Sequence, residues 1–438
     1  MSSSNGKVIL GAGVTGLAAG LASGFPVFEA REYVGGICGS YYIRPGARER
    51  LPSMPPDGET YRFEYGGGHW LFGGDAHVLG FINSLVSTRC YERRSSVFFP
   101  DDGLYVPYPL QNHLSCLPRE VAVRAITEIV HARTGSTPTL AAWLEQSFGP
   151  TLVERFFGPF HELYTAGLWT RIAPQDGHKS PAATAAVIRG ALDRVPPVGY
   201  NTTYVYPDAG LNVLAGRMAE RCDLKLGKRV VRIDTVRRII EFADGSTVAY
   251  RQVLSTLPLT SMCEIAGISL DAPSDPYTSV LVVNIGATKG LACPADHWIY
   301  VPKSRSGFHR VGFYSNVDAG FLPRDRREMT DCVSIYVERA YPGGQRPSEA
   351  EVTRLCEDVV GELRAWNFID QAEVVDPTWI DVAYTWSWPG STWKQQALTA
   401  LEREGIHQAG RYGRWVFQGI VESIAAGFVA GTAFRHAA

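Results

Sequence analysis

Short apolar runs and longer stretches with helical periodicity alternate along the chain. Residues 7–10 (KVIL) are an apolar run, followed by a glycine-rich turn and the helical stretch LAAGLAS. A second apolar run, PVFEA, ends at Glu29. A strand, a glycine turn, a helix and a second strand in this order predict the beginning of an α/β domain. Because Glu29 follows the third glycine of the turn by 13 residues, we expect the first helix to span about two turns.

The rest of the chain divides by the period of its apolar residues. Spacing of three and four residues predicts a mainly helical region over 118–195. Alternating residues and turn signals predict strands elsewhere: 57–65, three short strands and a return strand within 223–258, 278–285, and 331–338. We expect a helix at 348–366, and a strand, a turn and a helix of small residues near the C-terminus.

Composition limits the possible partners. The net charge is −2 with 20% charged residues, so no overall field attracts nucleic acid or an anionic membrane, and any anion site must be built locally. No apolar run approaches the roughly 20 residues that span a bilayer. The eight cysteines form no CxxC pair, which predicts reduced thiols and no metal site. We therefore expect a cytoplasmic protein without membrane or nucleic-acid partners; the oligomeric state cannot be read from the sequence.

The first turn carries a GxGxxG motif between a strand and a helix. Gly11 permits the tight turn, Gly13 lets backbone N–H groups approach a pyrophosphate, and Gly16 lets helix and strand pack closely. Glu29, at the end of the second strand, is placed to accept hydrogen bonds from an adenosine ribose. The motif predicts a dinucleotide site, and by itself leaves nicotinamide and flavin cofactors open.

The stretch AREYVGGICGS, which follows Glu29, resembles the FAD-binding half of the glutathione-reductase-like flavoproteins. In those proteins a glycine pair lets the chain pass close to the phosphate and ribityl part of the flavin, which here implicates Gly36. The resemblance also implies cofactor contacts for further residues: Arg31, Gly67, Val230, Gly410 and Ser423.

This resemblance implies an α/β fold with a glutathione-reductase-like, FAD-binding Rossmann domain, an inserted helical domain and a mixed β-sheet domain for the substrate. We expect the FAD-binding domain to be discontinuous, built from residues 1–75, 205–260 and 400–438. The helical domain is expected at 115–200, and the substrate domain at 76–114 plus 261–399.

Four stretches resemble UDP-galactopyranose mutases, most of all their eukaryotic-type branch. The first is YRFEYGGGHWLFGG, which is similar to the family's glycine–histidine loop against the flavin. It implies that Gly67 and Gly68 lie against the isoalloxazine and that His69 sits beside N5, where it can accept or relay a proton. The second is VPYPLQNH, which implies that Tyr108 and Gln111 contact the nucleotide, with Leu110 at the position of an aromatic residue that stacks on the base.

The other two stretches carry cations and phenols. In HWIYVPKSRSGFHRVGFYSNV, Tyr300 and Arg310 reproduce the family's spacing and are expected to hold the diphosphate. In GRYGRWVFQG, Arg411 matches an arginine at the diphosphate or sugar. The resemblance implies further substrate contacts, with departures from the family's residue types at two of them: Trp169, Tyr384, Trp388 in place of a tyrosine, and Phe417 in place of another.

The resembled family implies a function. Its reduced FAD acts as a nucleophile through N5 on the anomeric carbon of a nucleotide sugar, and the pyranose and furanose forms interconvert. We therefore expect a flavin-dependent nucleotide-sugar mutase with Gly68, His69, Tyr300, Arg310 and Arg411 at the reacting centre, activated by NAD(P)H or another reductant. A flavin oxidoreductase of the amine-oxidase or protoporphyrinogen-oxidase type shares the N-terminal pattern and remains the alternative.

Overall fold

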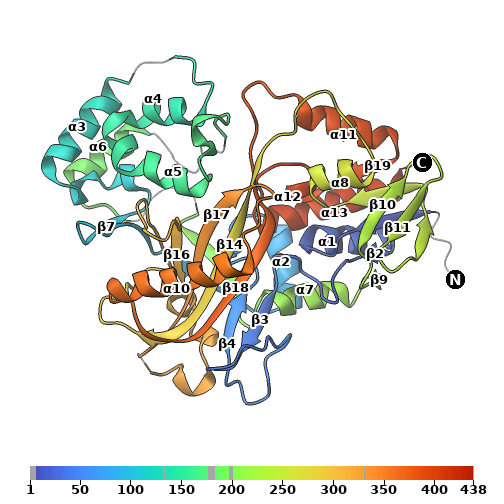
Figure 1. Cartoon of the computed structure of the whole chain (residues 1–438), viewed down its shortest axis with the longest axis horizontal. Coiled ribbons are helices and arrows are strands. Elements are labelled where there is room, and N and C mark those ends of the chain that lie inside the picture. Colours follow the sequence, from blue (N-terminus) through green and yellow to red (C-terminus); the bar gives the residue numbers. More distant parts are fainter. Residues whose placement is uncertain (1–5, 133–134, 176–182, 197–200, 330, 438) are drawn as a thin grey trace.

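The computed structural model describes residues 6–132, 135–175, 183–196, 201–329 and 331–437. Its mixture of parallel and antiparallel sheets with helices confirms the predicted α/β class. Figure 1 shows the helices α3–α6 at one end of the molecule, the elements of both termini at the other, and a large sheet between them. No helix in these described ranges is long and apolar enough to cross a bilayer.

A five-stranded parallel sheet gathers the beginning, middle and end of the chain. Its strands, in the order β19-β13-β1-β2-β9, are Ile406–Gln408, Gln252–Ser255, Lys7–Leu10, Val27–Phe28 and Leu224–Lys225. All four residues of β1 are buried, as a strand with both faces covered requires. Because β13 pairs with β1, and β19 with β13, from distant parts of the chain, the surroundings of the nucleotide turn after β1 are completed only by tertiary pairing.

The first helix, α1 (Val14–Ser23), is longer than predicted. Its ten residues make about 2.8 turns at 3.6 residues per turn. The expected two turns began after Gly16, whereas α1 begins at Val14, so the last residues of the glycine motif belong to its first turn. α1 packs against the C-terminal helix α13 (Ile420–His436) through glycines of α13.

A small antiparallel sheet joins this unit. It contains β10 (Val230–Asp234), β11 (Ile239–Phe242) and β12 (Thr247–Ala249). Residues 223–258 thus hold five strands, one more than the pattern predicts, because the two-residue β9 is defined by its pairing with β2 and has no local signal. Two antiparallel pairs lie nearby: β3 (Ser40–Ile43) with β4 (Tyr61–Glu64), and β5 (Thr88–Glu92) with β8 (Thr203–Pro207).

The large sheet has seven strands in the order β18-β14-β17-β16-β15-β6-β7. Their bounds are Ile369–Thr385, Tyr277–Lys289, Cys332–Pro342, Arg310–Phe313, Trp298–Tyr300, Ser95–Phe99 and Leu104–Pro107. The strands predicted at 278–285 and 331–338 are therefore confirmed as parts of β14 and β17. Helix α10 (Glu349–Ala365), which begins with a capping box between Ser348 and Glu351, covers an apolar core on this sheet and confirms the helix predicted at 348–366.

The helical region contains α3 (Arg119–Val130), α4 (Leu140–Leu152), α5 (Gly158–Tyr164) and α6 (Thr184–Leu192). It has its own core, which includes Leu144, Phe148 and Phe157. The remaining helices that exceed one turn are α2 (Ala76–Leu85), α7 (Leu211–Ala219), α8 (Leu259–Ile265) and α11 (Trp393–Arg403). β5, within the segment 76–114, pairs with β8, which begins at Thr203; this register ties the segment to the unit around the parallel sheet.

Candidate active site

A cavity of about 750 Å³ connects the nucleotide turn with the large sheet. Its walls come from residues 13–15, 35–38 and 66–72, from β15, β16 and β18, and from 409–423. The N-terminal segments lie hundreds of residues before those of the large sheet and the C-terminus, and β13 and β19 bring the C-terminal segment into the sheet that contains β1. The cavity joins half of the predicted cofactor residues, Gly13, Arg31, Gly36, Gly410 and Ser423, to most of the predicted substrate residues.

The GxGxxG turn has the backbone that the motif predicts. Gly11 adopts φ +93°, in the region that favours glycine. A Cβ on Gly16 would lie 1.8 Å from the carbonyl oxygen of Gly11, whereas a Cβ on Gly13 would meet nothing within 4 Å. The turn is therefore closed at Gly16 and open at Gly13, where a phosphate would approach.

Glu29, which directly follows β2, binds the same turn through its carboxylate. Its Oε2 accepts a hydrogen bond from the Ala12 N–H at 2.7 Å and its Oε1 accepts one from the Arg31 N–H at 3.0 Å. The carboxylate is fixed beside the glycine turn, in the place that suits a ribose contact.

The glycine pair beyond β2 narrows the cavity. Gly35 and Gly36 have φ values of +100° and +61°, and a Cβ on Gly36 would lie 3.5 Å from the Cα of Gly13. Gly35 forms an isolated parallel bridge with Gly13. Gly35, Gly36 and Arg31 line the part of the cavity that begins at the phosphate turn. Backbone N–H donors and glycines that let a ligand approach the backbone closely fit an adenine dinucleotide such as FAD.

The loop 66–69 lies deeper in the cavity. Gly67 has φ +76°, and a Cβ on Gly68 would lie 2.0 Å from the Tyr336 hydroxyl oxygen, so the loop is pressed flat against β17. The Nδ1 atom of His69 lies 3.3 Å from the Gly67 carbonyl oxygen. Burial, followed by the nearby Arg411, lowers the pKa of His69 to about 4, so its imidazole is neutral at physiological pH.

Tyr300 and Arg310 face each other across adjacent strands. They are register partners on β15 and β16, and both line the cavity. The Tyr300 ring lies 4.7 Å from that of Tyr108, which follows β7. The Nη2 atom of Arg310 donates to both carboxylate oxygens of Glu338, at 2.5 and 2.6 Å. The buried Glu338 carboxylate thus holds the Arg310 guanidinium in place.

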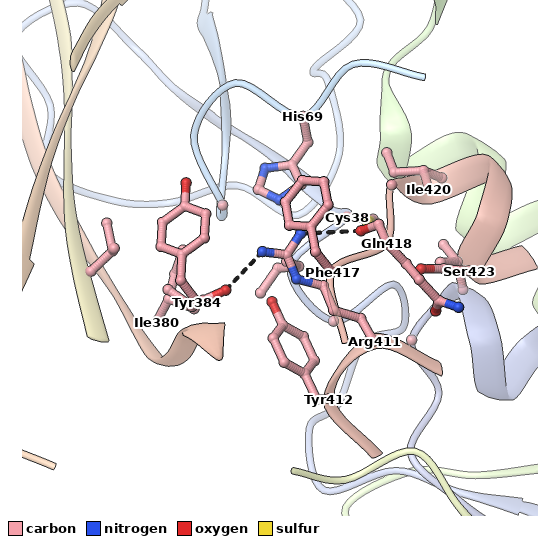
Figure 2. Close-up of a pocket in the computed structure, with 18 of the residues that line it drawn as sticks. Cys38, His69, Ile380, Tyr384, Arg411, Tyr412, Phe417, Gln418, Ile420 and Ser423 are labelled. Atoms are coloured by element: carbon pink, nitrogen blue, oxygen red, sulfur yellow. Dashed lines mark hydrogen bonds between the residues drawn. The ribbon is translucent and has the colours of Figure 1, made fainter. Parts of the chain in front are cut away.

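Arg411 occupies the middle of the cavity in Figure 2, between His69 and Tyr412. Its Nη2 donates to the Ala383 carbonyl oxygen at 2.8 Å and its Nη1 to the Gln418 carbonyl oxygen at 3.1 Å. The guanidinium lies 4.6 Å from the Phe417 ring centroid and 5.5 Å from that of Tyr384. Neutral carbonyls and aromatic faces hold this cation, so its charge is left to act on a ligand.

A comparison with known protein families identifies the family of this chain. Residues 19–425 match the family described as flavin containing amine oxidoreductase, which is nearly the whole chain. The chain belongs to this family. It is accordingly a flavoprotein of FAD-dependent, amine-oxidase-like fold, and the cavity residues beside the two glycine turns are those that would hold FAD.

Solved structures of several activities share the fold. A reduced UDP-galactopyranose mutase matches with a TM-score of 0.82 and 22% identity, over 97% of this chain and 94% of that chain. A putative protoporphyrinogen oxidase from Exiguobacterium sp. 255-15 matches with a TM-score of 0.69 and 16% identity, over 98% of both chains. A putrescine oxidase variant matches with a TM-score of 0.56 and 15% identity, over 98% of both chains. At such identities the likeness establishes the fold and leaves the reaction undecided.

Several predicted contacts do not reach the cavity. Leu110 is fully buried in the core of the helical region, and Gln111 is 1% exposed beside it. The Trp169 indole donates to Glu162 at 2.8 Å, within the helical region. None of these three residues lines the cavity. The segment after β7 turns into the helical core and takes Leu110 and Gln111 with it, whereas Trp169 is held by Glu162.

Two further predictions are displaced for local reasons. The Trp388 indole donates to the Ser274 carbonyl oxygen at 3.0 Å, which turns it away from the cavity. Val230 begins β10 and packs with the apolar cluster of the small sheet. By contrast, Tyr384 lines the cavity although its sequence position is out of register with the family's tyrosine.

Sequence reasoning missed many of the residues that line the cavity, and several of them carry polar groups. Arg93 is 4% exposed and donates through Nη2 to the Tyr108 carbonyl oxygen at 2.9 Å. Trp298, Glu338 and Asp381 also line the cavity. A signal for Glu338 was present: it is a carboxylate inside the otherwise apolar strand CVSIYVERAYP, where a charge needs a partner.

Proposed function

We propose that the protein is a flavin-dependent nucleotide-sugar mutase that interconverts pyranose and furanose forms of its substrate. The convergence of Tyr300, Arg310 and Arg411 with the loop 66–69 in one cavity carries this proposal. Two guanidinium groups and a phenol suit a doubly charged diphosphate, which must leave the sugar and return to it. The fold shared with a reduced UDP-galactopyranose mutase adds support.

In this proposal reduced FAD supplies a nucleophilic nitrogen for the anomeric carbon. Arg310, Arg411 and Tyr300 bind the diphosphate and keep it within reach, so that positioning supplies most of the rate. His69, which lines the cavity, would accept or relay a proton near the sugar in this proposal. Phe417 contributes an apolar face where the resembled family has a hydroxyl, which favours a substrate other than UDP-galactose.

The proposal is tested with purified FAD-loaded protein reduced by dithionite. It is incubated with a panel of nucleoside-diphosphate sugars, and the products are examined by mass spectrometry and NMR. We expect a product of unchanged mass with a changed ring size, and no stoichiometric consumption of reductant. Absence of any isomer across the panel would contradict the mutase proposal.

The alternative is a flavin oxidoreductase, which the family match and the oxidase neighbours support. Arg310 and Arg411 disfavour a cationic amine by charge repulsion, so an anionic substrate fits this alternative better. An oxidase would bleach its flavin with substrate and consume oxygen with release of peroxide. Oxygen uptake with amines and with anionic substrates therefore separates the two activities.

A further inference from the structure

Glu338 is a buried carboxylate that the proposed reaction does not itself use. It is 2% exposed and stands on β17 as the register partner of Arg310 on β16. Both of its oxygens accept from the same nitrogen, Nη2 of Arg310. Burial alone would raise the pKa of Glu338, but the Arg310 guanidinium and His309 lower it to about 2. The pair is therefore ionised throughout the neutral range.

The same carboxylate also touches the glycine loop. A Cβ on Gly67 would lie 2.8 Å from Oε1 of Glu338, so the loop and the carboxylate are in close contact. His309, which is fully buried, places its Nε2 at 3.6 Å from Oε2. The His309 ring in turn packs 5.2 Å from Tyr164 and 6.1 Å from Phe160, both on α5. Glu338 is thus enclosed between the loop, Arg310 and the helical region.

Glu338 holds only part of the Arg310 guanidinium. The hydrogen bonds to the carboxylate come from Nη2, and Nε, which is buried, has no hydrogen-bond partner among the described residues. The Arg310 side chain is 19% exposed, and it lines the cavity. A guanidinium has five donors in a rigid plane, so fixing one nitrogen orients the others.

We propose that Glu338 is a positioning residue: it holds Arg310 by one nitrogen so that the remaining donors face the diphosphate, at a fixed separation from the loop 66–69. This inference rests on the proposed function and names the residue that organises its anion site. In this proposal Glu338, which also lines the cavity, acts through Arg310 and not on the reacting atoms.

Removal of the carboxylate has two opposing effects on binding. It takes a negative charge away from the neighbourhood of a bound diphosphate, which favours binding. It also frees the guanidinium to reorient, which disfavours binding. These effects partly cancel in Kd. They do not cancel in kcat, because turnover requires the diphosphate to be held in one geometry while it leaves and returns.

The test compares Glu338→Gln with Glu362→Gln in the FAD-loaded enzyme. Glu362 is a matched control, since it is also buried and accepts the N–H groups of Arg305 and Ser306 at 2.8 Å, far from the cavity lining. For Glu338→Gln we expect kcat to fall at least tenfold, with the Kd of UDP, followed by flavin absorbance, within threefold of wild type. The Glu362 variant should keep both values.

A double-mutant cycle shows whether Glu338 acts through Arg310. In an Arg310→Ala background, Glu338→Gln should cause no further loss of kcat, whereas a general structural role would give additive losses. Glu338→Asp keeps the charge but shortens its reach, should show the same fall in kcat, and replaces the Gln variant if that variant does not retain flavin.

Unchanged kcat in Glu338→Gln, or additive losses in the cycle, would overturn the positioning role while the mutase activity of the wild type stands. A wild-type enzyme that neither binds UDP nor forms an isomer would instead overturn the proposed function itself.

Discussion

The two arginines of the cavity have different electrostatic surroundings. Arg310 is neutralised by Glu338, whereas Arg411 is held by the carbonyl oxygens of Ala383 and Gln418. A carbonyl bears only a partial charge, so Arg411 leaves more net positive charge in the cavity than Arg310 does. Arg411 therefore supplies most of the attraction for an anion, and Arg310 supplies oriented donors.

Truncation of Arg310 should weaken anion binding. We expect Arg310→Ala to reduce the affinity for UDP by about 2–3 kcal/mol, the scale of a lost hydrogen bond to a charged group. Isothermal titration of the FAD-loaded protein measures this. Arg305→Ala, an exposed arginine five residues earlier, is the control and should bind as wild type. Equal affinities for wild type and Arg310→Ala would remove Arg310 from the anion site.

At the scale of elements, the contact between α1 and α13 sets the position of the nucleotide turn. A Cβ on Gly427 would lie 2.3 Å from the Thr15 carbonyl oxygen, and one on Gly431 would lie 2.5 Å from that of Ala19. The two helices are therefore closer than any larger residue permits. Since Thr15 belongs to the first turn of α1 and Ser423 of α13 lines the cavity, this contact couples helix packing to the cofactor slot.

Two helix glycines should respond oppositely to the same substitution. Gly427→Ala should destabilise the fold by about 1–3 kcal/mol, because the added methyl group forces the helices apart. Gly361→Ala, at an exposed position of α10 where a Cβ meets nothing within 4 Å, should stabilise the fold by about 0.5–1 kcal/mol through helix propensity. Urea unfolding monitored by circular dichroism gives both values. A stabilising Gly427→Ala would show that the helices can separate at little cost.

At the scale of the whole molecule, burial of titratable groups links stability to pH. Burial lowers the pKa of His69, His113 and His161 to about 4 and that of His297 to about 3. These groups gain protons on unfolding between their folded values and about 6.5. Burial raises the pKa of Glu64 to about 7, and this group has the opposite effect between about 4.5 and 7.

The effect of the four histidines on proton binding outweighs that of Glu64, so the unfolded state binds more protons than the folded state between about pH 5 and 6.5. The free energy of unfolding should therefore fall as the pH is lowered through this window. We expect a lower Tm at pH 5 than at pH 7. Thermal unfolding of the FAD-loaded protein at constant ionic strength measures the shift. A Tm that is constant or rises toward pH 5 would show that these imidazoles are hydrated in the folded state.

The sequence by itself determined the local backbone chemistry of this protein. The GxGxxG turn, the pair Gly35–Gly36 and the loop 66–69 could be identified because a glycine's freedom depends on its own missing Cβ. The family resemblance likewise predicted that Tyr300 and Arg310 lie together, and the two residues are register partners on β15 and β16.

Only the tertiary structure decided which of these parts meet. Glu338 joins Arg310 to Gly67 because β17 lies beside β16, and Arg411 reaches the Ala383 carbonyl because β18 forms a wall of the cavity. Leu110, in contrast, is drawn into the helical core, because an apolar side chain gains more from burial there than from a polar cavity. Which residues meet depends on how whole elements pack against one another, and a local sequence pattern does not hold that information.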